Sequence, residues 1–265
     1  MLRLLKALPL TLALAALSLF ASSCGTSTTQ VRFVNAIPDT LDYGGGNGAL
    51  DLQFNGTTEF SNIPFLNASG STYKSVPAGS DTIKGFEAGS TTNQVFSQTL
   101  SLNSGKQYTV VATGSAANGG SNVVLLSPVD NNTAPALGNV NFRFINASPS
   151  GPNGSRAAAD IYILPVACVL GSTGCTPAIS ALAYQNSASA TLPFNSQGTG
   201  WLLIVTVAGN TTAEGQIINA SIGNFGSTSV GAICTLVLTD EQNVQIMNTT
   251  PMVLQDLNAS GCTVN

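Results

Sequence analysis

Hydrophobic and polar residues alternate along much of the chain with the period of two that is typical of a half-buried β-strand. The segment from Asp51 to Phe54 alternates strictly, and residues 108–112 form an almost continuous run of β-branched and apolar side chains. Clusters of Gly, Asn, Ser and Pro separate such segments, for example at residues 43–48, 77–80 and 103–106. After residue 24, no long apolar repeat at helical spacing occurs. The pattern therefore predicts an all-β fold of short strands joined by turns.

The same series of strands occurs twice. The stretch "VRFVNAIP" at residues 31–38 corresponds to "FRFINASP" at residues 142–149, and later segments correspond in the same order. These later pairs are residues 51–54 with 160–163, 62–65 with 181–184, 108–114 with 234–240, and 122–126 with 243–247. A period of about 110 to 125 residues is too long for a solenoid repeat and is typical of a duplicated domain.

About seven short strands in each half predict two tandem immunoglobulin-like antiparallel β-sandwiches. We place the first sandwich at residues 31–127 and the second at residues 140–265. Between them, residues 128–139 read "PVDNNTAPALGN", with Pro and Gly breaks and no periodicity, which predicts a linker.

The N-terminus has the pattern of a processing signal. Arg3 and Lys6 precede an apolar run from Leu8 to Phe20, which is too short to cross a bilayer. The small residues before Cys24 resemble the lipobox of bacterial lipoproteins, in which residues 1–23 are removed and the Cys is acylated. Because Ala21 stands where that motif usually has a larger aliphatic residue, plain secretion and a retained anchor are the alternatives. Residues 24–30 would then form a short tether.

The cysteines fit an oxidising compartment. If Cys24 carries lipid, four cysteines remain, which suggests two disulfides with three possible connectivities. We favour Cys168–Cys175 and Cys234–Cys262, the first closing a loop and the second fixing the C-terminal tail. A metal site is the rival interpretation, which the absence of His and of any C-x-x-C pair disfavours.

Both halves resemble a bacterial family of domains of unknown function, DUF4397. Its members open with a strand of the form R-h-x-H-A-S-P-D and continue with an aspartate-led strand, a "PAG" turn and a "GK-x-YTVV" strand. The matching residues are Arg32, Ala36, Pro38, Asp39, Asp51, residues 77–79 and 105–111, and in the second half Arg143, residues 147–149 and Asp160. Asn35 and Asn146 stand where the family has His, so any role of that His is not carried over. The resemblance implies tandem sandwiches on a secreted or surface protein and brings no known activity.

Each repeat contains one Arg and one Asp at corresponding positions. We expect Arg32 to face out or to pair with Asp51, and Arg143 likewise to pair with Asp160. A structural pair is the favoured interpretation, and a ligand-binding pair is the alternative.

Several kinds of chemistry are disfavoured by the composition. With no His, catalytic triads and the commonest zinc sites are excluded. A net charge of −4 without basic clusters disfavours a nucleic-acid partner. Asp39, Asp42 and Asp51 could hold calcium weakly, although their spacing matches no EF-hand. The only Trp, Trp201, lies in a run that predicts a buried strand, and a sugar-stacking surface is the lesser alternative.

The sequence therefore predicts a non-catalytic protein of the bacterial cell envelope, without a cofactor, held to the membrane by lipid. We expect a binding, adhesion or structural role, with an envelope protein or glycan as the partner. The alternative is a lectin-like polysaccharide-binding protein or a glycan hydrolase. Gly25 rather than Asp follows Cys24, which favours the outer membrane. The loop at residues 164–178 is an insertion in the second half and a candidate contact surface.

Overall fold

The computed structural model describes residues 27–39, 48–70, 72–164, 169–194, 200–212, 216–223, 231–241, 244–247, 250–257 and 262–264. Within these ranges the chain forms β-strands and two single-turn 3-10 helices, η2 (Asn118–Gly120) and η3 (Pro152–Gly154). The all-β prediction is confirmed. In the same ranges, no helix is long and apolar enough to cross a membrane.

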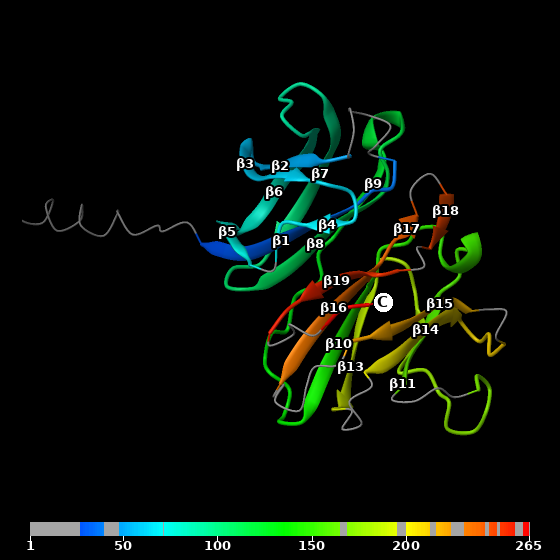
Figure 1. Ribbon diagram of the computed structural model, residues 1–265. Coiled ribbons are helices and arrows are strands. Elements are labelled where there is room, and N and C mark those ends of the chain that lie inside the picture. Colours follow the sequence, from blue (N-terminus) through cyan, green and yellow to red (C-terminus); the bar gives the residue numbers. More distant parts are fainter. Residues whose placement is uncertain are drawn as a thin grey trace, which may run out of the picture.

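The first sandwich consists of two sheets (Figure 1). One has the order β4–β1–β8–β9, with β5 also pairing with β1: β4 (Asn67–Ala68), β1 (Thr28–Ala36), β8 (Gln107–Ser115), β9 (Asn122–Leu126) and β5 (Lys74–Pro77). The other has the order β3–β2–β6–β7: β3 (Thr57–Ile63), β2 (Leu50–Phe54), β6 (Gly79–Glu87) and β7 (Gln94–Leu102).

The second sandwich repeats this plan. Its first sheet has the order β13–β10–β16–β19: β13 (Ser187–Pro193), β10 (Asn139–Asn146), β16 (Ala232–Leu238) and β19 (Met252–Gln255). Its second sheet has the order β12–β11–β14–β15: β12 (Ile179–Leu182), β11 (Ala159–Leu164), β14 (Trp201–Val207) and β15 (Gln216–Ile222). A two-stranded ribbon, β17 (Asp240–Glu241) with β18 (Val244–Met247), follows β16.

Not all of the pairing is antiparallel. Strand β1 runs parallel to β8, and β10 runs parallel to β16. In each sandwich the chain passes through the opposite sheet between these two strands, so it can return in the same direction.

The strand register corrects one of the correspondences between the halves. Strand β9 pairs with β8 through Val111 and Leu126, whereas in the second sandwich Val237 of β16 pairs with Met252 of β19. The counterpart of residues 122–126 is therefore in and just before β19. Of the segment that the sequence pattern suggested, residues 244–247 form β18 and pair with β17 instead.

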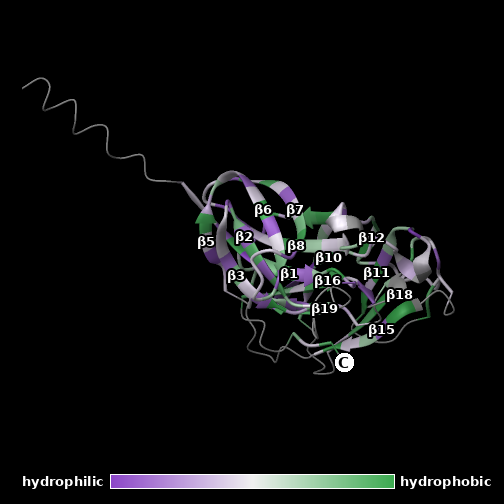
Figure 2. Cartoon of the chain, turned by 90° about the horizontal axis from the view of Figure 1, so that it is seen from above, coloured by the Kyte–Doolittle hydropathy of each residue, from purple (hydrophilic) through white to green (hydrophobic). Residues whose placement is uncertain are grey.

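The two sandwiches pack face to face, so that the molecule has four layers of sheet (Figures 1 and 2). In β1, Val31 and Phe33 belong to the core of the first sandwich. On the opposite face of the same strand, Val34 and Ala36 belong to a cluster shared by both sandwiches. Its other buried members are Val111, Leu126, Ile145, Ala147, Val237 and Leu254. Because both faces of β1 are covered, its residues from 31 to 36 are all buried.

Trp201 lies in the core of the second sandwich, as predicted from its strand. Trp201 is 3% exposed. Its ring packs edge to face against Phe142 and Phe194, with ring centroids 5.2 Å and 6.1 Å apart. The outer face of the same sheet carries a smaller apolar cluster of Tyr162 and Ile204 under Cys175. Cys175 belongs to the inserted loop at residues 164–178, so this part of the loop covers apolar surface of its own sandwich.

Candidate functional site between the two sandwiches

The two repeated arginines neither face solvent nor pair with the aspartates predicted for them, Asp51 and Asp160. Arg32 on β1 and Arg143 on β10 are buried between the sandwiches, where Arg32 is 0% exposed and Arg143 is 4% exposed. The predicted pairs with Asp51 and Asp160 are therefore wrong. The reason is the face-to-face packing, which covers the outer side of both strands with the other sandwich.

Two other aspartates pair with these arginines across the interface. Nη1 of Arg32 contacts Oδ1 of Asp256, which follows β19. Nη1 of Arg143 lies 3.2 Å from Oδ1 of Asp130, which follows β9. Each arginine thus reaches an aspartate of the other sandwich. The arginines also share their partners, since Nη2 of Arg143 lies 3.0 Å from Asp256 and Nη2 of Arg32 lies 3.9 Å from Asp130. We call these four residues the buried tetrad.

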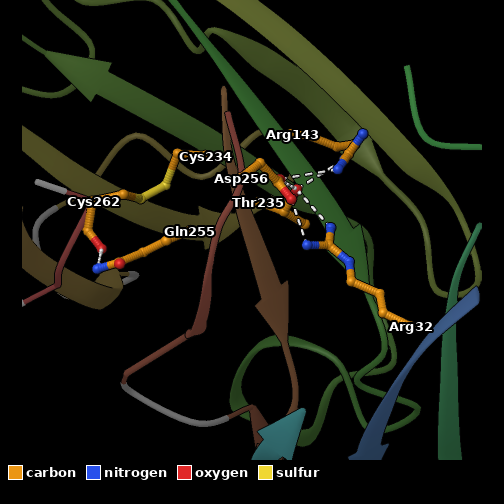
Figure 3. Close-up of a disulfide and its surroundings, with 7 residues drawn as sticks. All are labelled: Arg32, Arg143, Cys234, Thr235, Gln255, Asp256 and Cys262. Atoms are coloured by element: carbon orange, nitrogen blue, oxygen red, sulfur yellow. Dashed lines mark hydrogen bonds and ion pairs between the residues drawn. A yellow bond between two sulfur atoms is a disulfide. The ribbon is translucent and has the colours of Figure 1, made fainter. Parts of the chain in front are cut away.

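Two threonines complete the tetrad in the same way on each side. Nε of Arg32 donates to Oγ1 of Thr109 at 2.7 Å, and Thr109 donates to Asp130 at 2.6 Å. Nε of Arg143 donates to Oγ1 of Thr235 at 2.8 Å, and Thr235 donates to Asp256. In both halves, the Thr precedes the Asp by 21 residues. Figure 3 shows Arg32 and Arg143 both pointing at Asp256 beside Thr235.

Tyr73 closes the tetrad on the side of the first sandwich. Its ring lies under the guanidinium of Arg32 at 5.1 Å, and its hydroxyl donates to Asp130 at 2.7 Å. Burial raises the pKa of Tyr73 to about 12, so the phenol stays protonated and remains a donor. Two arginines and two aspartates make the tetrad neutral overall, and paired charges with further hydrogen bonds are the form in which burial is tolerated.

Sequence reasoning missed Asp130, Asp256, Thr109 and Thr235. Asp130 lies in the segment predicted as a linker, and Asp256 lies in the predicted second sandwich without a predicted role. The equal Thr-to-Asp spacing in the two halves was the signal that could have found them.

Asp51 and Asp160 have a different role, which they share. Asp51 accepts hydrogen bonds from the amides of Asn62 at 2.7 Å and Gly89 at 2.9 Å. Asp160 accepts them from Ala181 at 2.7 Å and Gly209 at 2.8 Å. Asn62 and Ala181 both have positive φ, at 55° and 50°. These carboxylates therefore hold a strand irregularity at the same place in each sandwich, where the register of β2 with β3 and of β11 with β12 shifts.

Asn35 and Asn146, at the position of the family's His, are fully buried and structural. The side-chain amide of Asn35 donates to the carbonyls of Gly48 and Ile63, and that of Asn146 donates to the carbonyl of Leu182. Each fixes the connection between its strand and the opposite sheet.

A cleft of about 340 Å³ opens beyond the ends of β1 and β10. Both repeated motifs contribute to it at equivalent positions, because Pro38 and Asp39 line one side and Pro149 and Ser150 the other. Its remaining lining residues are Gly114, Ser115, Asn122, Arg156, Asp240 and Glu241. The cleft therefore exists only when the two sandwiches are packed together.

Two carboxylates that line the cleft accept hydrogen bonds within their own sandwich. One follows the first of the two parallel strands, and the other follows the second. Asp39, after β1, accepts from the hydroxyl of Ser115 at 2.7 Å and the amide of Ala116 at 2.8 Å, beyond β8. Asp240, beyond β16, accepts from the hydroxyl of Ser148, after β10. Burial raises the pKa of Asp240 above its ordinary value of 3.8. In both sandwiches these hydrogen bonds join the ends of the two parallel strands. The carboxylate follows β1 in the first sandwich and β16 in the second.

Arg156 and Glu241 are the charged side chains of the cleft that are available to contact a ligand. Arg156 is exposed and Glu241 is half-buried, and within the described part of the chain neither belongs to an ion pair. The cleft thus presents one positive and one negative side chain between Pro38 on one side and Pro149 on the other.

The disulfide between Cys234 and Cys262 is confirmed, with Cα atoms 6.0 Å apart. Nε2 of Gln255 donates to the carbonyl of Cys262 at 3.2 Å, which holds the tail against β19 (Figure 3). Cys175 is also disulfide-bonded, and its predicted partner Cys168 lies outside the described residues.

The other predicted site residues are only partly described. Cys24 and Asp42 lie outside the described residues. Asp39 and Asp51 have backbone amides as partners, and among the described residues no group of three or more metal-ligating side chains occurs.

Comparison with known proteins gives a family match for the first part of the chain. Residues 29–153 match the family described as a domain of unknown function, DUF4397, which covers the first sandwich, the connecting segment and β10. None of the curated proteins matches the chain in sequence.

Two solved structures are similar to the chain over most of its length. One is of family 41 carbohydrate-binding modules from streptococcal virulence factors that recognise alpha-glucan, with 10% identity, 83% of this chain and 97% of that chain covered, and a TM-score of 0.25. The other is a protein from Bacteroides uniformis provisionally classed as a cell adhesion protein, with 14% identity, 86% and 98% coverage, and a TM-score of 0.25.

Proposed function

We propose that the chain is a non-catalytic binding or adhesion protein of the bacterial cell envelope, built from two DUF4397 domains and anchored by lipid at Cys24. The equivalent contacts of Asp51 and Asp160, and of Arg32 and Arg143, support the second sandwich as a diverged copy of the first. The signal-like residues 1–23 and the disulfide between Cys234 and Cys262 support an oxidising compartment outside the cytoplasm.

The observation that carries the proposal is the cleft at the ends of both repeated motifs. Ligand sites are commonly concave and lie between domains, with a few polar groups that converge on the ligand. The cleft meets this description, and the buried tetrad and the shared apolar cluster fix its two sides relative to each other.

The cleft supports binding better than glycan hydrolysis. A hydrolase needs one carboxylic acid and one carboxylate that both reach the glycosidic bond. Asp240 is 2% exposed and Asp39 already accepts three hydrogen bonds from the end of β8 and the residues after it. Among the lining residues there is no aromatic side chain on which a sugar could stack.

The test is capture of envelope components by the mature chain without lipid, residues 25–265, against glycan and envelope-protein fractions. The double variant Arg156→Ala and Glu241→Ala should lose the captured component. Lys84→Ala, which removes a charge from the outer sheet of the first sandwich, is the matched control and should bind normally. Unchanged capture by the double variant would remove the cleft from the proposal.

A further inference from the structure

The interface between the sandwiches has the contact pattern of a symmetric homodimer. In such an interface, residue i of one subunit contacts residue j of the other, and j contacts i. Here Arg32 contacts Asp256, and its equivalent Arg143 contacts Asp130, the equivalent of Asp256. The two threonine bonds are repeated in the same way. One chain therefore contains both halves of a self-complementary contact.

Four of the apolar positions in the interface are nearly the same on both sides. The strand registers place Arg32 opposite Thr109 and Arg143 opposite Thr235, and Val111 opposite Leu126 and Val237 opposite Met252. They therefore define these equivalent pairs: Val34 with Ile145, Ala36 with Ala147, Val111 with Val237, and Leu126 with Met252. Within these four pairs the differences are one methylene and one exchange of similar volume, which cores tolerate well. Leu254 of the same cluster corresponds by register to Pro128, so the match does not extend to every apolar position.

We propose that the face formed by β1, β8 and β9 is a homotypic docking surface whose partner is a second copy of the first sandwich. In that pair, Arg32 of each copy contacts Asp130 of the other, and Tyr73 stacks on each arginine. The charges balance without any residue of the second sandwich, because each copy brings one arginine and one aspartate. In the intact chain the second sandwich occupies this face.

The first test keeps the protein as a tandem chain. Residues 139–257 are replaced by a second copy of residues 28–130 after the unchanged segment 131–138. This doubled chain should be a compact monomer with one cooperative unfolding transition, which we also expect of the parent chain. Two independent transitions and an enlarged hydrodynamic radius would overturn the proposal.

A charge exchange in the doubled chain tests the predicted pairing itself. Arg32→Asp in the first copy alone places two carboxylates together and should separate the two unfolding transitions. Adding Asp130→Arg in the second copy restores opposite charges and should restore the single transition. Asp130→Arg in the first copy instead is the matched control, and it should give no rescue. Equal behaviour of the two double variants would contradict the pairing.

A second measurement tests the homotypic docking surface if the doubled chain does not fold. All strand pairs of the first sandwich lie within residues 28–129, and it has its own core. A protease site in the exposed segment 133–137 of the full chain releases this sandwich. Once separated, the fragment should sediment as a folded dimer, and Asp130→Arg should make it monomeric. A fragment that is monomeric without the substitution, or unfolded, would refute the proposal.

Discussion

Replacing Asp256 with Asn removes one charge from the buried tetrad while leaving its volume unchanged. Asp256 contacts Arg32 and Arg143 and accepts from Thr235, and its side chain is 3% exposed. After the substitution, two buried guanidinium groups share the single carboxylate of Asp130. Removing one partner of a buried ion pair costs about 3–5 kcal/mol, because the remaining charge stays desolvated. We expect Asp256→Asn to lower the free energy of unfolding by that amount.

The assay is urea unfolding followed by far-UV circular dichroism for the whole chain and by fluorescence of Trp201 for the second sandwich. Trp201 is the only Trp in the chain, so its signal reports that sandwich alone. Because the lost contacts lie between the sandwiches, the two signals should coincide in the parent chain and separate in the variant.

The control is Glu59→Gln, which breaks the ion pair with Lys74 on the surface. The side chain of Lys74 is 48% exposed, and exposed pairs contribute about 0–1 kcal/mol. A double-mutant cycle of Arg32→Met with Asp256→Asn should show a coupling of about 0.5–3 kcal/mol. If Asp256→Asn costs no more than Glu59→Gln, or the cycle shows no coupling, the tetrad does not hold the sandwiches together.

Three further outcomes are expected. Cys24→Ser should move the protein from the membrane fraction to the soluble fraction on cell fractionation, and an unchanged membrane fraction would contradict lipidation. Cys234→Ser should lower the free energy of unfolding of the second sandwich by about 2–4 kcal/mol in the Trp201 signal, because the loop to Cys262 is no longer closed; an unshifted midpoint would count against this. Asp240 has a raised pKa in the folded protein, so its contribution to stability is highest below the ordinary value of 3.8 and is lost as the pH rises through the raised value. Asp240→Asn should therefore remove this loss of unfolding free energy with rising pH. A variant whose pH profile stays parallel to that of the parent would argue against burial as the cause of the raised pKa.

The sequence by itself determined the strands and their repetition, because both depend on local order. The alternation in β2 and the turn clusters define strands of a half-buried sheet. The pairing of Cys234 with Cys262 belonged to the favoured one of the three connectivities that the sequence left open, and the structure confirms it. Trp201 was placed in a core because its strand reads as apolar on both faces.

Only the tertiary structure decided what Arg32 and Arg143 do. In a single sandwich, the outer face of β1 would meet water, and an arginine there would be an ordinary surface residue. The second sandwich covers that face, and the resulting loss of water makes a paired carboxylate necessary. That carboxylate, Asp256, is 224 residues away from Arg32, so no local pattern could pair the two, although the repeated Thr-to-Asp spacing of 21 residues marks the aspartate itself. The cleft lined by both motifs depends on the same contact, because packing brings the ends of β1 and β10 together across the interface.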